Sequence, residues 1–327
     1  MAKTINKEQW LERRKTGVGG SDMAALLGVS PWRTSLNVWM DKTDEGPAVD
    51  MPTVRQRIGT ALEPLAAEMY TEQSGRKVRK CNIQLEGSGH RIGNVDRLVY
   101  CEDGHLPWRR NAGVITERAL EIKTTSEMAE WDRVPDHYIT QIQHYMGLMP
   151  TVKVVDVPVL FLSLGTFRIY HVERDDSLIA DMAKVAEEFW TKYVRTKTPP
   201  PPQDEDDLKV MFPRHEEGLK CIADDDVMAA YNEYMRLAAV VKQAEDDLNQ
   251  QKFIIESAMK AAEVLETPDH RKLVTWKTGK DVEKVDWKAA FEELADAYGD
   301  HDAANAVIGA HTTTRPGSRT FRLSAGK

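Results

Sequence analysis

The stretch "ALEIKTTSE", Ala119 to Glu127, sets a glutamate and a lysine two positions apart inside an apolar run. In a β-strand alternate side chains point to the same side, so Glu121 and Lys123 would share one face while Leu120 and Ile122 point to the other. Two interpretations follow. One is an exposed ion pair on a half-buried strand, and the other is a metal-binding carboxylate with a lysine beside it for phosphodiester chemistry. Because so short a pattern is common by chance, the rest of the chain has to decide between them.

The composition is that of a globular protein, with 41% hydrophobic and 29% charged residues among 327. No run is apolar for long enough to span a bilayer, and the start "MAKTINKEQWLERRK" is too polar for a secretory signal, so we expect a cytoplasmic protein. Cys81, Cys101 and Cys221 are too far apart to suggest a disulfide framework or a paired metal clamp. The net charge of −8 argues against a protein that coats nucleic acid with its whole surface, but it permits a DNA enzyme with a local basic groove.

Helices and strands are mixed along the first part of the chain. Helices are expected over 21–28, 57–75, 135–149 and 176–194, and strands over 76–86, 90–100, 113–125, 152–163 and 167–173. Gly75 is a natural C-terminal cap for the second of these helices. Helices that flank a central set of strands predict an α/β layered domain over residues 1–198.

The stretch "TKTPPPPQDEDD", which begins at Thr196, predicts a boundary. Consecutive prolines favour extended geometry and the acidic run is solvated, so we expect a linker over 199–225. Over 226–264 apolar residues recur in steps of three and four, which predicts an amphipathic helix, or a coiled-coil hairpin if 249–252 forms a turn. Residues 226–327 are thus expected to be a mainly helical region with a small β element. Its remaining elements are expected at 272–279, 285–298 and 319–324.

Two further acidic residues suit the metal-site interpretation of Glu121. Asp96, in "GNVDRLVY", lies inside a predicted strand, and Glu63, in "RIGTALEPLA", lies near the start of a helix among apolar neighbours. A buried carboxylate is costly unless it is paired or binds a metal, and one or two Mg²⁺ ions could satisfy all three acids with Lys123 beside them. The alternatives are a salt bridge from Asp96 to Arg97 or a turn, and for Glu63 a charge favoured by the helix dipole.

This order of residues resembles the PD-(D/E)XK nuclease superfamily, in which a helix glutamate precedes a strand aspartate and a strand Glu-x-Lys. It is most similar to the YqaJ viral recombinase branch, the relatives of bacteriophage lambda exonuclease. The resemblance covers nearly all of residues 10–195. The segments that carry it are "GVGGSDMAALLGVSPWRT", "RIGTALEPLAAEMY", "GNVDRLVY", "LEIKTTS", "VPDHYITQIQHYMGLM" and "FRIYHVERDDSLIADMAKVAEEFW". The resemblance implies a restriction-endonuclease-like core, a central mixed sheet flanked by helices, with a helical C-terminal extension.

The resemblance also implies roles for matching residues around the metal. Glu63, Asp96 and Glu121 would line the metal site, and the backbone carbonyl of Ile122 would be an extra ligand. Lys123 would be the catalytic lysine.

Three further positions match the family pattern. Gln141 falls where the family places a glutamine beside the active site, whereas Gln143 lies on a different face of the helix; the alternative for Gln141 is a polar residue on a solvated face. In "WLERRKTGVGGSD", Arg14 and Ser21 would form a pocket for a terminal 5′-phosphate, because a guanidinium binds phosphate bidentately. The alternative for Ser21 is a helix N-cap.

An insert at 101–118 departs from the compact family pattern. Trp108, Arg109 and Arg110 lie at its centre. An aromatic ring beside two arginines could stack on a base or wedge a duplex end, or the insert could be a plain surface hairpin, which we favour.

The function implied by the resemblance is a metal-dependent 5′-to-3′ exonuclease on linear double-stranded DNA. It would leave 3′ single-stranded overhangs for phage-type recombination by strand annealing. The expected cofactor is Mg²⁺, with Mn²⁺ able to substitute. The expected partners are DNA ends, a single-strand annealing protein and further copies of the chain in a trimeric ring, within a bacterial cell or phage-infected host. A restriction-type endonuclease and a non-catalytic DNA-binding scaffold on the same fold stay open as alternatives.

Overall fold

The chain divides into two units, Met1–Pro213 and Arg214–Lys327, and each is described by itself. The computed structural model describes residues 14–43, 53–81, 83–109, 111–281, 286–299 and 301–313.

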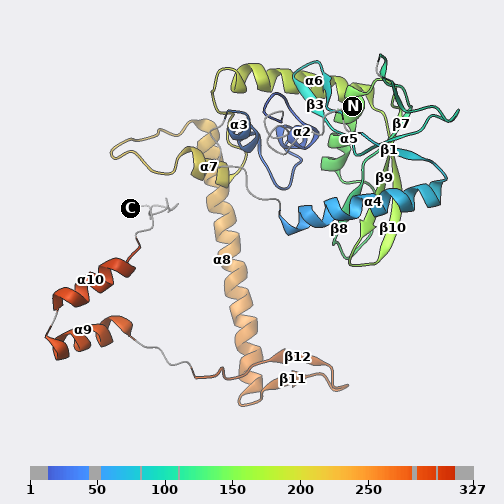
Figure 1. The fold of residues 1–327 in the computed structure, drawn as a ribbon. Coiled ribbons are helices and arrows are strands. Elements are labelled where there is room, and N and C mark those ends of the chain that lie inside the picture. The colour runs from blue at the N-terminus through green and yellow to red at the C-terminus, as the bar shows by residue number, and fades with distance from the viewer. Residues whose placement is uncertain are drawn as a thin grey trace. The chain divides into compact units, whose positions relative to one another are not determined.

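A six-stranded mixed sheet forms the centre of the first unit (Figure 1). Its order is β1-β4-β7-β9-β10, and β8 continues beside β9. β7 and β8 run parallel to β9, and the other neighbouring pairs are antiparallel. The strands are β1 (Val78–Lys80), β4 (Arg97–Val99), β7 (Arg118–Leu120), β8 (Lys123–Thr125), β9 (Val154–Phe161) and β10 (Thr166–Glu173). The predicted α/β class with a central mixed sheet is therefore confirmed.

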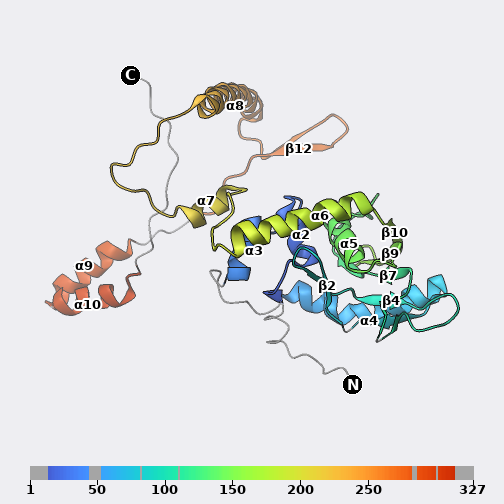
Figure 2. The same cartoon turned by 90° about the horizontal axis from the view of Figure 1, so that it is seen from above.

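Helix α4 (Val54–Ser74) covers one face of this sheet. Its Ala66 and Tyr70 pack against Leu120 and Ile122, which are buried there as the alternation of the strand predicts. Figures 1 and 2 show α4 on the opposite side of the strands from α5 and α6.

Both ends of α4 are capped by their own residues. The hydroxyl of Thr53 accepts the backbone N–H of Gln56 at 3.2 Å, and the Gln56 side chain accepts the Thr53 N–H at 2.9 Å. Gly75 ends the helix with a φ of 71°, the left-handed conformation that glycine adopts without steric cost, so the predicted cap is present.

Helices α2 (Gly20–Leu26), α5 (Asp136–Leu148) and α6 (Asp176–Phe189) cover the opposite face. α6 continues into a π-helical turn at Trp190–Val194, and α3 (Ser35–Thr43) packs against α2 and that turn. The core on this side joins helix and strand residues, among them Met23, Ala119, Ile142, Met146, Val155, Val157 and Met182.

The first unit extends beyond the expected boundary at residue 198. The proline segment leads into α7 (Glu205–Met211), where the buried Asp207 accepts the backbone N–H of Gln203 at 2.9 Å. The Gln203 side chain in turn accepts the N–H of Ser35, at the start of α3, at 2.7 Å. Because these polar groups satisfy a helix terminus of the first unit, the first part of the expected linker is a folded part of that unit, which ends at Pro213.

Two hairpins lie outside the sheet. β2 (Leu85–Gly87) pairs with β3 (Arg91–Gly93), and β5 (Trp108–Arg109) pairs with β6 (Gly113–Val114). The second is the insert, which forms the expected hairpin, and its Trp108 is half-buried and packs against the core. Arg110 lies outside the described residues.

The second unit contains one helix of 35 residues, α8 (Asp225–Met259). It runs without the turn at 249–252 that a hairpin would need. The other elements are β11 (Val264–Glu266), β12 (Lys272–Thr275), α9 (Trp287–Tyr298) and α10 (His301–His311). The strand expected at 319–324 lies outside the described residues. No helix in the described part of the chain combines the length and the apolar character needed to cross a membrane.

Candidate active site

Asp96 and Glu121 stand opposite each other where β4 begins and β7 ends. The register of these antiparallel strands pairs Arg97 with Leu120, so one step further brings Asp96 beside Glu121. Opposed side chains of antiparallel strands lie on the same face of a sheet, and this face is the one turned away from Leu120 and α4.

The carboxylate of Asp96 binds the backbone next to Glu121. The N–H of Glu121 donates to the carbonyl of Asp156 in β9 at 3.0 Å. The N–H of Ile122 donates to the Asp96 carboxylate at 2.8 Å. One acidic side chain therefore lies directly against the backbone that follows the other.

Lys123 is held from three sides. Its ammonium donates to the Glu121 carboxylate at 2.9 Å and to the side-chain oxygen of Gln141 at 2.9 Å, and it lies 4.5 Å from the centre of the Tyr138 ring. Burial by itself would lower the pKa of Lys123, but the carboxylates of Glu121 and Asp96 raise it above its usual value. The side chain is therefore a fixed ammonium rather than a free base.

The two carboxylates lack enough partners of their own. Burial, together with the nearby charge of Glu121, raises the pKa of Asp96 to about 8, although Lys123 and the Ile122 N–H partly offset this. The second oxygen of Glu121, Oε2, is buried and has no hydrogen-bond partner. A buried carboxylate oxygen without a partner calls for an explanation such as a cation, and hard oxygen ligands are those that Mg²⁺ prefers.

Glu63 lies in the middle of α4 and not near its start. Its carboxylate contacts the guanidinium of Arg97 and lies 3.8 Å from Lys80. Arg97 also donates to the backbone carbonyl of Asp96 at 2.8 Å. Arg97 thus pairs with Glu63, and it contacts Asp96 through the backbone rather than through the salt bridge that was the alternative to a metal site.

In the described ranges no three His, Cys, Asp or Glu side chains gather closely enough to hold a metal ion. Of the three acids expected to converge, the structure brings Asp96 and Glu121 together, while Arg97 holds Glu63. Proteins commonly hold Mg²⁺ with one or two carboxylates and complete its shell with waters and substrate oxygens. The pair, with the orphan oxygen of Glu121, therefore fits part of a magnesium site.

Gln141 belongs to the site, and Gln143 does not. Gln141 accepts from Lys123 and donates through its amide nitrogen to the Tyr145 hydroxyl at 2.9 Å, so its face of α5 is not simply solvated. Gln143 is buried and hydrogen-bonds the backbone between β10 and α6.

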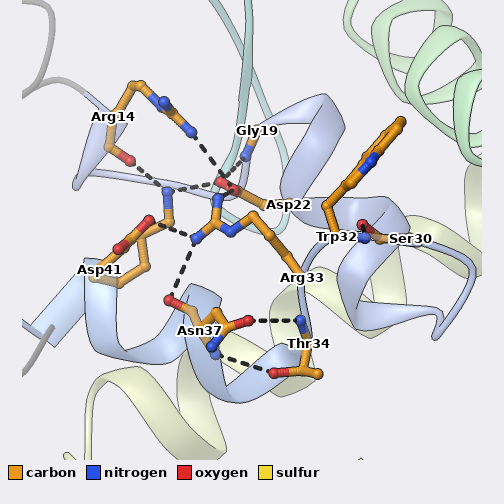
Figure 3. Close-up of polar contacts among 10 residues, drawn as sticks. Arg14, Gly19, Asp22, Ser30, Trp32, Arg33, Thr34, Asn37 and Asp41 are labelled. Carbon is orange, nitrogen blue, oxygen red and sulfur yellow. Dashed lines mark hydrogen bonds and ion pairs between the residues drawn. The ribbon is translucent and has the colours of Figure 1, made fainter. Parts of the chain in front are cut away.

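A second polar cluster surrounds Asp22, which is buried in the first turn of α2 (Figure 3). Its carboxylate lies 2.7 Å from Lys42, 3.2 Å from Arg33 and 3.8 Å from Arg14, and it accepts the backbone N–H of Gly19 at 3.0 Å. Burial by itself would raise the pKa of Asp22, but the three cations lower it well below its usual range.

The sequence-predicted phosphate residues lie at this cluster. Arg14 has 39% of its side chain exposed, and Ser21 is exposed immediately before Asp22. The N-cap of α2 is Gly19, so Ser21 is not the cap. Sequence reasoning missed Asp22 itself, although an acidic residue next to the apolar run "MAALL" signals a carboxylate in need of partners.

Gly20 connects the two clusters. A Cβ atom there would lie 2.8 Å from Cε1 of Tyr145 and 2.9 Å from Cγ of Gln141, so only glycine permits this approach of α2 to α5. Of these two residues, Gln141 accepts a hydrogen bond from Lys123, and Tyr145 accepts one from Gln141.

Residues 9–149 match the model of the YqaJ-like viral recombinase domain. The stretch includes Arg14, Asp96 and Lys123, together with the other residues singled out above as site residues.

One curated relative matches part of the chain. The chain is 32% identical over 197 residues to the uncharacterized protein YqaJ of Bacillus subtilis (strain 168), and the match covers 58% of this chain and 57% of that one. The chain therefore spans little more than half the length of this relative.

Solved structures are similar to the YqaJ-like domain at low identity. LHK-Exo in complex with dAMP has a TM-score of 0.47 at 18% identity, over 63% of this chain and 97% of that chain. The alkaline exonuclease LHK-Exo from Laribacter hongkongensis has a TM-score of 0.45 at 17% identity, over 59% and 94%. A phage related exonuclease from Haemophilus somnus 129PT has a TM-score of 0.41 at 13% identity, over 55% and 96%.

Proposed function

We propose that this chain is a metal-dependent DNA exonuclease. It degrades one strand of linear duplex from the 5′ end and leaves a 3′ overhang for recombination by strand annealing. The observation that carries the proposal is the pair formed by half-buried Asp96 and buried Glu121, with the Lys123 ammonium 2.9 Å from Glu121. The match of residues 9–149 to the model of a viral recombinase domain supports DNA as the substrate.

The carboxylates of Asp96 and Glu121 and the backbone carbonyl of Ile122 would hold Mg²⁺, with Mn²⁺ able to replace it. Glu63 is a further candidate from α4. When bound, the metal activates water and stabilises negative charge on the scissile phosphate.

The chain itself contributes a fixed positive charge. Lys123 is an ammonium whose position is set by Glu121, Gln141 and Tyr138. A preorganised cation in a water-poor site stabilises charge that develops in the transition state without having to reorganise first. In this role Lys123 orients the attacking water or the phosphate, and Gln141 positions Lys123.

In this proposal the cluster around Asp22 sets the direction of degradation, which begins at the 5′ end. Arg14 and Ser21 would bind the terminal 5′-phosphate, and the cations that surround the single buried carboxylate suit an anion. Because Gly20 joins this cluster to Gln141, a bound 5′ end would be held in fixed relation to Lys123.

The resemblance to lambda-exonuclease-type enzymes also supports two partners. One is a single-strand annealing protein that takes the exposed strand, and the other is further copies of the chain in a trimeric ring. Exposed apolar residues of α8, such as Tyr231, Val241 and Leu248, offer a docking surface for either.

The test is digestion of linear duplex DNA, with and without a 5′-phosphate, in Mg²⁺, in Mn²⁺ and in chelator. We expect metal-dependent loss of the 5′-ended strand, faster with the phosphate, and loss of that preference in Arg14→Ala. Lys153→Ala is the matched control, because Lys153 pairs with Glu117 on the exposed surface. No digestion in either metal would overturn the proposal, and equal loss of closed circular DNA would favour the restriction-type alternative.

A further inference from the structure

Trp32 is an exposed aromatic side chain beside the Asp22 cluster. It is 63% exposed, and its backbone N–H donates to the hydroxyl of Ser30 at 3.3 Å. The next residue, Arg33, points into the cluster, whereas the indole of Trp32 points away from it (Figure 3). One short loop thus presents a cation and a flat ring in different directions.

The indole is oriented by its neighbours on α5. Its centre lies 4.7 Å from that of the His137 ring at an interplanar angle of 82°, an edge-to-face contact, and 6.3 Å from that of Tyr138. Nε2 of His137 is buried and has no hydrogen-bond partner. The ring of Trp32 is therefore supported on one side and open to solvent over most of its area.

The same aromatic residues lead to the candidate active site. The rings of His137 and Tyr138 are 4.1 Å apart, and the ammonium of Lys123 lies 4.5 Å from the centre of the Tyr138 ring. Two rings thus connect the exposed indole to the ammonium that contacts Glu121. Trp32 and the candidate active site are therefore connected through side chains of α5.

The charges near the loop favour a nucleotide as the occupant. Arg14, Arg33 and Lys42 meet the carboxylate of Asp22, and Arg33 also pairs with Asp41 at 2.5 Å, so these residues carry more positive than negative charge. A nucleotide offers both an anionic phosphate and a flat base, and an aromatic ring beside cations is the arrangement that binds single strands without sequence preference. An apolar protein segment would use the ring but not the cations.

We propose that Trp32 stacks on a nucleobase of the strand being degraded, next to the terminal phosphate. This deepens the proposed function and rests on it. Trp32 acts as a positioning and binding residue for substrate: it holds the end of the strand against the Asp22 cluster without touching the reacting atoms.

The experiment combines Trp32 variants with DNA that lacks a base. Trp32→Ala removes the ring, Trp32→Leu keeps apolar bulk without a ring face, and Trp32→Phe keeps a ring. Trp287→Ala is the control, because Trp287 is 77% exposed in the second unit. KM and kcat are measured on 5′-phosphorylated duplexes that carry either ordinary nucleotides or one abasic site, moved through the first positions of the degraded strand.

We expect Trp32→Ala and Trp32→Leu to raise KM by about tenfold, within the range measured for loss of one stacked base, with little change in kcat. Trp32→Phe and Trp287→Ala should stay within about threefold of the unsubstituted chain. At one position the abasic site should raise the KM of the unsubstituted chain by a similar factor and should add nothing in Trp32→Ala, because the same contact is already lost.

If the abasic penalty is as large in Trp32→Ala as in the unsubstituted chain, stacking on Trp32 is excluded while the exonuclease assignment stands. An unchanged KM in both Trp32→Ala and Trp32→Leu would also exclude stacking on Trp32. The indole would then serve a contact with protein rather than with DNA. Failure of the unsubstituted chain to digest any linear duplex overturns the proposed function and this inference together.

Discussion

The side-chain oxygen of Gln141 accepts a hydrogen bond from the Lys123 ammonium at 2.9 Å and so joins helix α5 to strand β8 at the candidate site. The same amide donates to Tyr145, whose ring contacts the first turn of α2 near Gly20. One glutamine therefore relates the carboxylate pair to the cationic cluster around Asp22. The following variants test whether this relationship matters for activity or only for packing.

Replacing Lys123 with methionine should abolish most hydrolysis, because it removes the ammonium but keeps much of the bulk. Loss of one preorganised charge-stabilising group typically costs about 100- to 1000-fold in kcat. The variant should also lose stability, since Glu121 would keep a buried charge without its partner. Digestion rates in Mg²⁺ and thermal melting check both effects against Lys153→Met. A kcat within threefold of the unsubstituted chain would contradict the role of Lys123.

Gln141→Ala and Gln143→Ala should show opposite patterns although they lie two residues apart. Gln141→Ala frees Lys123, so kcat should fall about tenfold or more with a small change in stability. Gln143→Ala leaves backbone groups near Glu173 and Asp175 without partners, at a cost of about 1–3 kcal/mol, and should leave kcat unchanged while the protein is folded. Chemical unfolding measures the change in stability of each variant, and single-turnover digestion measures the change in its rate. Equal effects on both measurements would mean that neither residue has the role assigned to it.

Local sequence patterns were sufficient for the mixed α/β class and for one face of the site, but the stretches expected as strands at 76–86 and 90–100 are each divided between the central sheet and the β2–β3 hairpin. The alternation around Glu121 predicted which residues share a face, and Leu120 and Ile122 do pack together against α4. Period-2 patterning is a property of the strand itself, so it can be recognised without knowledge of its neighbours. The same holds for the C-terminal cap at Gly75.

Partners far apart in the sequence could not be predicted in this way. The contact of Glu63 with Arg97 depends on how α4 crosses the sheet, and the hydrogen bond from the Ile122 N–H to Asp96 depends on the pairing of β4 with β7. The proline segment was interpreted from its local composition as a linker, but buried Asp207 ties α7 to the first unit. Such contacts form only in the folded chain, so the local composition does not predict them.

Gly20→Ala should disturb the site through packing alone. The added methyl group would lie 2.8 Å from the Tyr145 ring and 2.9 Å from Gln141, closer than real Cβ contacts allow. We expect a loss of about 1–3 kcal/mol of stability, the usual cost of overpacking, and a fall in kcat as Gln141 is displaced from Lys123. Gly279→Ala is the control, since no atom lies within 4 Å of the Cβ position there. A Gly20→Ala protein with unchanged melting temperature and kcat would show that α2 and α5 are not in close contact.

His144 should make the folded protein less stable in mild acid. It is fully buried on α5, where its Nε2 lies 2.9 Å from the carbonyl of Ile92 and its Nδ1 has no partner. Burial, with the nearby charge of Arg91, lowers the pKa of His144 to about 4, against 6.5 for an ordinary histidine. Between these values the unfolded chain binds the proton and the folded chain does not, so stability is intact above pH 6.5 and falls as the pH drops toward 4, by about 2 kcal/mol at pH 5.

Urea unfolding at pH 7.5 and pH 5.0 measures this loss of stability. Because other groups also titrate, the same pair of measurements on His144→Gln isolates the share of His144. The loss between the two pH values should be smaller in the variant, and an equal loss would mean that His144 is not held neutral in the folded state.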